Sequence, residues 1–106
     1  MPFVKLSDIE KRKIIEGTEV RFVHSDSMTL AHWNFKSGAN IPEHSHHHEQ
    51  MTRVINGEFE LTIDGESQVL TNNDVAVIPP HAVHSGKALT ECYIIDVFHP
   101  VRKDYR

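Results

Sequence analysis

The sequence predicts an all-β fold, on the strength of three observations. Apolar and polar residues alternate in short runs, and Phe59-Glu60-Leu61-Thr62-Ile63 places its three apolar side chains on one face of a strand. Two turn-forming dipeptides, Asn56-Gly57 and Asp64-Gly65, lie at the ends of such runs. Only the capping box Ser7-Asp8-Ile9-Glu10 begins a helix, and the segment after it is too short for more than one or two turns.

The expected strands follow one another at short, regular spacing. Their ranges are 20–24, 28–36, 51–55, 58–63, 67–70, 75–78 and 91–98, with Ser-, Asn-, Asp- and Gly-rich turns between them. The strands between 51 and 70 are joined by the Asn-Gly and Asp-Gly dipeptides, which predicts a meander of three neighbouring strands. Many short strands of this kind indicate a sandwich or a barrel.

Length and composition indicate one globular domain, residues 1–106. Apolar residues make up 39% and charged residues 25%, and the net charge of −4 with no long basic run argues against nucleic acid as a partner. No apolar run is long enough to span a membrane, and the residues after Met1 do not resemble a signal peptide. The single cysteine, Cys92, excludes an intrachain disulfide, so we expect a cytoplasmic protein.

Histidine is the abnormal component of the composition. There are nine in 106 residues, and four of them lie between positions 44 and 48. Clustered imidazoles in the middle of a chain indicate a metal site. On an unbroken strand His44, His46 and Gln50 share one face and Glu49 faces away. A further ligand must come from another strand, and His84 follows the rigid Pro79-Pro80 corner.

Two other histidines and one acid need a separate interpretation. His48 shares the parity of the expected ligands and is placed at the mouth of the pocket, whereas His47 is expected to face solvent. Asp96 interrupts the apolar run from Cys92 to Phe98, and a carboxylate in a sheet interior needs a cation, a donor or a water-filled cavity. A purely structural alternative pairs Asp96 with Arg102 or Arg53.

The spacing of these residues resembles the two motifs of the cupin family. Gly38, His44-x-His46, Gln50 and Gly57 match the first motif, and Asn73, Pro79-x-His81 and His84 match the second. The resemblance implies a double-stranded β-helix, a jelly-roll barrel that holds one divalent transition metal ion. The chain departs from the family at Gln50, where a glutamate is usual, and at Asn73 and His81, where glycines are usual.

The ligand set implied by the resemblance, His44, His46, Gln50 and His84, carries no charge. The ion would therefore keep its full +2 charge. This charge favours a Lewis acid that binds an anionic substrate, rather than an iron centre that activates oxygen. Such a set suits Ni, Zn, Mn, Fe or Co, and the sequence does not choose among them.

The run from Asp96 to Tyr105, Asp-Val-Phe-x-Pro-x-Arg-x-Asp-Tyr, is similar to the C-terminal signature of small cupins of pectin degradation. Those proteins convert 4,5-unsaturated uronate monosaccharides, released by pectin or alginate lyases, to linear keto uronates by ring opening and tautomerisation. The resemblance implies a small anionic sugar as the substrate. It makes Asp96 and Arg102 candidate catalytic residues, and Phe98 and Arg102 candidate substrate-binding residues.

Two other functions stay open at this stage. The same barrel hosts metal-dependent dioxygenases, and a non-catalytic sugar-binding cupin would also keep the fold. We also expect a homodimer, because cupin barrels expose sheet edges that a partner commonly covers.

Overall fold

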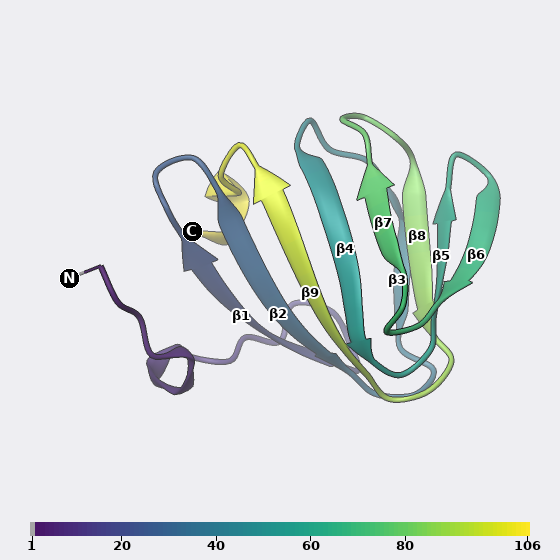
Figure 1. The fold of residues 1–106 in the computed structure, drawn as a ribbon, viewed down its shortest axis with the longest axis horizontal. Coiled ribbons are helices and arrows are strands. Elements are labelled where there is room, and N and C mark those ends of the chain that lie inside the picture. Colours follow the sequence, from purple (N-terminus) through teal and green to yellow (C-terminus); the bar gives the residue numbers. More distant parts are fainter. Residues whose placement is uncertain (1) are drawn as a thin grey trace.

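Two antiparallel sheets face each other across the protein (Figure 1). The computed structural model describes residues 2–106; Met1, the first residue of the expected domain, lies outside them. One sheet has five strands in the order β1-β2-β9-β4-β7, and the other has four in the order β3-β8-β5-β6. The all-β prediction is confirmed, and the arrangement is the jelly-roll barrel expected from the sequence.

The strands are short and account for most of the chain. Their bounds are β1 Thr18–His24, β2 Thr29–Phe35, β3 Asn40–His44, β4 Glu49–Asn56, β5 Phe59–Ile63, β6 Glu66–Leu70, β7 Val75–Ile78, β8 His84–Ala88 and β9 Cys92–His99. Two 3₁₀ helices, η1 Leu6–Asp8 and η2 Lys103–Tyr105, lie before and after the sheets. None of the helical segments in residues 2–106 is long and apolar enough to cross a lipid bilayer.

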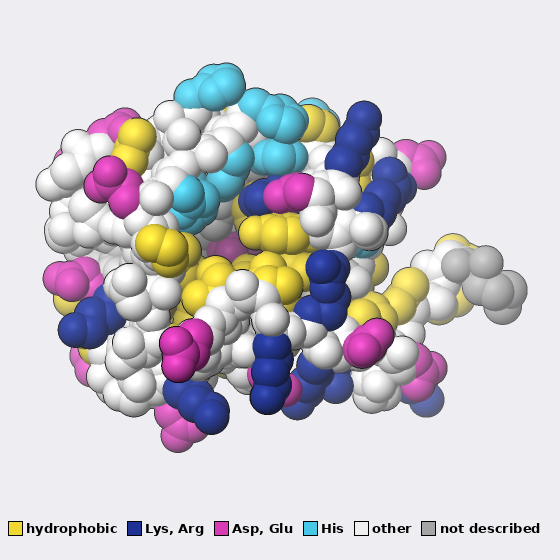
Figure 2. Space-filling view, turned by 180° about the vertical axis from the view of Figure 1, so that it is seen from behind, with side chains coloured by type: hydrophobic (Ala, Val, Ile, Leu, Met, Phe, Trp, Pro, Cys, Tyr) yellow, Lys and Arg dark blue, Asp and Glu magenta, His cyan; other side chains and the backbone are white. Residues whose placement is uncertain are grey.

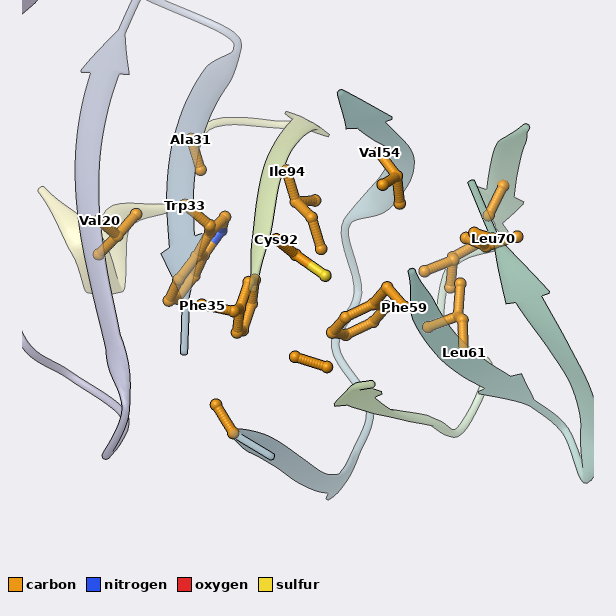
Figure 3. Packing of buried hydrophobic residues seen from close by; sticks show 14 of the residues in the cluster. Val20, Ala31, Trp33, Phe35, Val54, Phe59, Leu61, Leu70, Cys92 and Ile94 are labelled. Atoms are coloured by element: carbon orange, nitrogen blue, oxygen red, sulfur yellow. The ribbon is translucent and has the colours of Figure 1, made fainter. Parts of the chain in front are cut away.

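The core lies between the sheets, where the inward side chains of both meet (Figure 3). Burial alternates along β2 and β9, as the period of two requires. Trp33 stacks on Phe35 with ring centroids 5.5 Å apart, and Phe35 reaches Phe59 of the opposite sheet at 5.2 Å. Each such buried side chain contributes roughly 1.5–3 kcal/mol to the free energy of folding.

The expected three-strand meander is wrong in part. β4 pairs with β7 and β9, whereas β5 pairs with β6 and β8, so the Asn56-Gly57 turn carries the chain from one sheet to the other. Of the two dipeptides, Asp64-Gly65 alone closes a hairpin, and both of its residues have positive φ, 47° and 84°. A turn dipeptide permits the chain to reverse but does not decide which strand becomes the neighbour.

The sequence pattern did not predict two of the strands, β3 and β8. β3 is exposed along nearly its whole length, and β8 contains Gly86 among polar residues, so neither shows a regular apolar alternation. The helix expected after Ser7 is a single 3₁₀ turn, η1, on a segment that extends away from the sheets (Figure 1).

Candidate metal centre and adjoining cavity

Three histidines converge at one end of the barrel. One ring nitrogen from each of His44, His46 and His84 lies within 4.8 Å of the others. The ring centroids of His44 and His84 are 4.2 Å apart, and those of His46 and His84 are 4.9 Å apart. Figure 2 shows histidine side chains along one rim of a hollow in which apolar side chains are visible.

The chain brings these rings together by crossing between the sheets. His44 ends β3 and lies opposite His84, the first residue of β8, after a register shift in β3. His46 lies in the loop between β3 and β4, so the expected unbroken strand from 44 to 50 is wrong. The chain leaves the four-stranded sheet at His44 and enters the five-stranded sheet at Glu49.

Hydrogen bonds fix the orientation of all three imidazoles. The Nδ1 atoms of His44 and His84 each lie 2.9 Å from a backbone carbonyl, of Pro42 and Ala82, and Nδ1 of His46 lies 3.1 Å from the carbonyl of His48. Because a carbonyl oxygen can only accept, each Nδ1 donates and each Nε2 keeps its lone pair. The buried Nε2 of His84 has no hydrogen-bond partner among the described residues. An outward lone pair on each ring is what a metal ion requires.

Gln50 of β4 lies next to this group of imidazoles. It is buried at 7% exposure, whereas Glu49 is exposed, and its Oε1 lies 3.1 Å from Nε2 of His46. The Gln50 amide nitrogen donates to Oγ1 of Thr52 at 3.1 Å, so Oε1 and the His46 nitrogen face each other as two acceptors. A cation between them would satisfy both atoms, and the neutral nitrogen and oxygen donors fit a divalent transition metal ion.

Burial favours the neutral form of two of these imidazoles, His46 and His84. The pKa of His46 is lowered to about 4, first by burial and then by the charges of Arg102 and His84. Burial also lowers the pKa of His84.

A cavity of about 200 Å³ adjoins the histidines. His44, Gln50 and His84 border it, and so do the other candidate residues Asp96, Phe98 and Arg102. His46 is not among the lining residues but belongs to the histidine cluster. The structure therefore places residues from both motifs and from the C-terminal run of the sequence around one cavity.

Asp96 is enclosed in the wall of this cavity. It is 7% exposed, and the hydroxyl of Thr52 donates to its Oδ1 at 2.7 Å. Burial raises the pKa of Asp96 to about 6, against the opposing effect of the hydrogen bond from Thr52. Thr52 was missed in the sequence, although it has the same strand parity as Gln50.

The structural alternative for Asp96, an ion pair with an arginine, is wrong. Arg102 forms its ion pair with Asp104 at 2.7 Å, and Arg53 donates to the backbone carbonyl of Asn72. Arg53 follows Thr52 in β4 and lies opposite Val75 of β7, so its parity directs it away from the interior where Asp96 lies.

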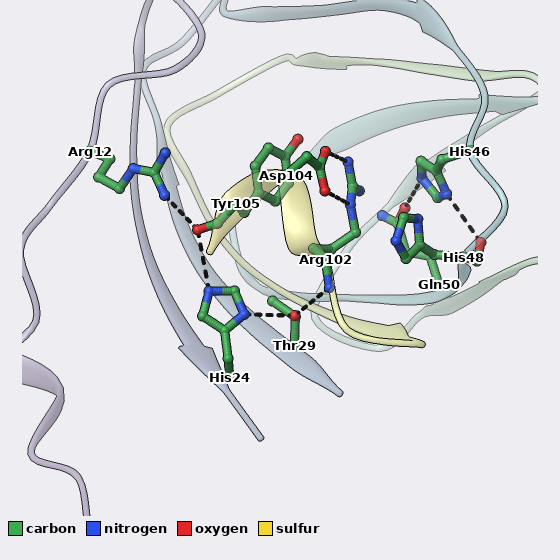
Figure 4. A network of polar contacts seen from close by, with 9 residues as sticks. All are labelled: Arg12, His24, Thr29, His46, His48, Gln50, Arg102, Asp104 and Tyr105. Carbon is green, nitrogen blue, oxygen red and sulfur yellow. Dashed lines mark hydrogen bonds and ion pairs between the residues drawn. The ribbon is translucent and has the colours of Figure 1, made fainter. Parts of the chain in front are cut away.

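Arg102 is buried beside the cavity, between two aromatic rings. Its guanidinium carbon lies 4.7 Å from the ring centroid of Phe98 and 4.2 Å from that of Tyr105. Asp104 accepts from Nε at 3.0 Å and from Nη2 at 2.7 Å (Figure 4). Asp104 and Tyr105 were part of the C-terminal signature, but the sequence alone did not assign them a role.

The two remaining histidines of the run differ in burial. His47 is exposed, as expected, whereas His48 is buried at 5% exposure and lies outside the cluster of possible ligands. The backbone carbonyl of His48 supports His46, and its ring approaches Phe98 with centroids 6.4 Å apart.

Fold and motifs together define the class of protein. The family model of the Cupin domain matches residues 31–98, and the chain belongs to this family. The structural match to known cupins extends over the whole chain. An RmlC-like cupin from Shewanella frigidimarina NCIMB 400 superimposes with a TM-score of 0.94 at 30% identity, covering 100% of this chain and 96% of that one.

The chain is also similar to particular cupins called KdgF. It is 33% identical over 106 residues to the pectin degradation protein KdgF of Dickeya dadantii (strain 3937), with 98% of this chain and 90% of the relative covered. The structure of KdgF from Halomonas sp. matches with a TM-score of 0.92 at 28% identity, covering 100% of this chain and 99% of that one. An oxalate decarboxylase from Bacillus subtilis, at 24% identity and a TM-score of 0.80, shares the fold alone.

Proposed function

We propose that this cupin acts in uronate breakdown, as a metal-dependent isomerase that opens the ring of 4,5-unsaturated uronate monosaccharides. The observation that carries the proposal is that a buried carboxyl, Asp96, and a buried cation, Arg102, border the same cavity as the histidine cluster. The similarity to KdgF of Dickeya dadantii, a pectin degradation protein, supports the same substrate class. Sugars of this class come from pectin or alginate lyases.

The proposed reaction is a rearrangement without a redox step. The C1 hydroxyl loses its proton as the C1–O5 bond breaks and C1 becomes an aldehyde. The electron pair of that bond stays on O5, which becomes an enolate conjugated to the carboxylate. A proton added at C4 then gives the C5 ketone, so the linear keto uronate has the same atoms as the substrate.

Asp96 is the proposed acid–base group for these transfers. Its Oδ1 is fixed by the Thr52 hydroxyl at 2.7 Å, so the carboxyl has a defined orientation in the cavity wall. As a carboxylate it accepts the proton of the C1 hydroxyl, and as an acid it returns a proton to C4.

The other side chains bind and orient the sugar. Arg102 pairs with the substrate carboxylate, because a guanidinium matches the geometry of an anion with two oxygens. Phe98, which is 3% exposed, forms an apolar wall against one face of the ring. A Ni, Zn, Mn, Fe or Co ion held by His44, His46, Gln50 and His84 would supply a Lewis acid for the negative charge that develops on O5.

The test is turnover of a purified 4,5-unsaturated monouronate by metal-loaded protein. We expect the ultraviolet absorbance of the conjugated enol to disappear faster than in a protein-free blank, and NMR of the product to show the linear keto form. Oxygen consumption by iron-loaded protein would instead indicate a dioxygenase. Binding of the sugar without turnover would indicate a sugar-binding cupin, and either result would overturn the proposal.

A further inference from the structure

The guanidinium of Arg102 is confined on three sides by the C-terminal segment and β9. Its side chain is only 8% exposed, and the rings of Phe98 and Tyr105 lie 4.7 and 4.2 Å from it. The backbone is held as well, because the N–H of Arg102 donates to Oγ1 of Thr29 at 2.9 Å (Figure 4). A long side chain that ordinarily samples many rotamers is thus held in one.

Asp104 occupies one edge of this guanidinium. It accepts from Nε and Nη2, which together form that edge, while Nη1 makes no hydrogen bond to another described residue. Arg102 also lines the cavity next to the histidines. The ion pair therefore leaves donors of the guanidinium for an anion bound in that cavity.

We propose that Asp104 is a positioning residue that holds Arg102 for the carboxylate of the substrate, with Tyr105 as the second aromatic wall of the arginine. This inference rests on the proposed function. It extends the substrate site beyond the barrel, because Asp104 and Tyr105 belong to η2.

The exposure of Asp104 separates positioning from a structural role. Its side chain is 54% exposed, and an ion pair with a partner this accessible to water adds little to fold stability. Without the carboxylate, the Arg102 side chain would be mobile and would have to be ordered again when the substrate binds. The lost conformational entropy would weaken substrate binding and raise KM about tenfold. We therefore expect Asp104→Asn to raise KM about tenfold, to leave kcat within about twofold, and to leave the melting temperature nearly unchanged.

Kinetics with matched controls test the proposal. Asp26→Asn removes an exposed carboxylate from the loop between β1 and β2 and should not change KM. Tyr105→Leu removes the aromatic ring beside Arg102 and should raise KM. Asp104→Glu, which keeps the charge on a longer side chain, replaces Asp104→Asn if the latter fails to fold.

A double-mutant cycle examines whether Asp104 acts through Arg102. In an Arg102→Lys background, which has no Nε–H for Asp104 to hold, Asp104→Asn should raise KM little further. Fully additive effects on KM, or an Asp104→Asn variant with the KM of the parent, would overturn the inference.

One measurement does not depend on the substrate. In a ¹H–¹⁵N spectrum, the Nε–H of Arg102, assigned by its absence from Arg102→Lys, should exchange slowly with water in the parent and quickly in Asp104→Asn. If the parent fails to turn over the uronate but this contrast is present, the proposed function fails while the positioning of Arg102 stands. If exchange is fast in both proteins, Asp104 does not position Arg102.

Discussion

At the scale of single residues, Asp96 offers the sharpest test of the proposed chemistry. Asparagine has nearly the same volume and can accept the same hydrogen bond from Thr52, so Asp96→Asn should keep the fold and the metal content. Loss of one positioned proton carrier should lower kcat by roughly 10²–10⁴. The melting temperature, metal stoichiometry and kcat are measured on one preparation. An unchanged kcat would remove Asp96 from the mechanism.

His32, on the outer face of the five-stranded sheet, leads to a prediction about how stability depends on pH. Burial, and then the charge of Arg21, lower the pKa of His32, whose Nδ1 lies 2.5 Å from the hydroxyl of Tyr93. Below the ordinary histidine pKa of about 6.5 the unfolded chain binds a proton that the folded chain resists, so stability falls as the pH falls. Removal of this group should therefore flatten the pH dependence of stability.

The measurement compares His32→Asn with the parent. Between about pH 7.5 and about pH 5.5 the melting temperature of the parent should fall further than that of the variant. The buried site histidines are present in both proteins, so their contribution cancels in the difference. Parallel curves would show that His32 does not contribute to the acid sensitivity.

At the scale of elements, Gly86 determines how closely β8 approaches β5. A Cβ at this position would lie 2.3 Å from Cζ of Phe59, a buried ring that has little room to move. Gly86→Ala should therefore destabilise the fold by roughly 1–3 kcal/mol, as overpacked cores do. Denaturant unfolding measures the change, and Ser85→Ala, at the neighbouring position of β8, is the matched control. A free energy of unfolding equal to that of the parent would contradict the close packing.

The elements also show where sequence patterns are informative. Strands with a buried face, such as β5, could be predicted because the alternation of apolar residues reflects their burial. β3 has no buried face and was missed. The same limit affected the candidate site. Strand parity correctly predicted that Gln50 faces the interior and Glu49 faces away. The strand assumed to run from His44 to Gln50, however, is interrupted by a loop that crosses from one sheet to the other.

At the scale of the whole molecule, the candidate ligands come from both sheets. His44 and His84 belong to the four-stranded sheet, and Gln50 belongs to the five-stranded sheet. No local pattern predicts that such distant positions meet, and the spacing of the family motifs supplied that information. A metal ion bound by this set requires the folded barrel, because the unfolded chain does not hold the ligands together.

Metal loading should therefore stabilise the protein against heat. At a free metal concentration about 100 times Kd the gain is about 2.7 kcal/mol, and a chelator should reverse it. His47→Ala, which removes an exposed imidazole from the same run, should keep the effect, whereas His46→Ala should reduce it. If metal raises the melting temperature of a variant that lacks His46 and also lacks His84 as much as it raises that of the parent, the ion binds elsewhere.

The homodimer expected from the sequence stays a prediction. Within the described chain, β7, β3 and β6 end a sheet with one edge not paired to another strand, whereas the outer edge of β1 is bridged to Arg12. Exposed edges of this kind can pair with another chain. Sedimentation velocity at several protein concentrations measures the mass directly. A monomer throughout would contradict the expectation.

The different placement of the two chain ends has a practical consequence for producing this protein. The carbonyl of Tyr105 accepts from Nη1 of Arg12 at 2.7 Å and lies 3.3 Å from Nε2 of His24, so the last residues are bonded to the barrel beside Arg102. The segment before η1, in contrast, extends away from both sheets (Figure 1). An affinity tag is therefore better fused ahead of residue 2 than after Arg106. A polyhistidine tag at the latter end would bring extra imidazoles close to a cavity whose candidate metal ligands are themselves imidazoles.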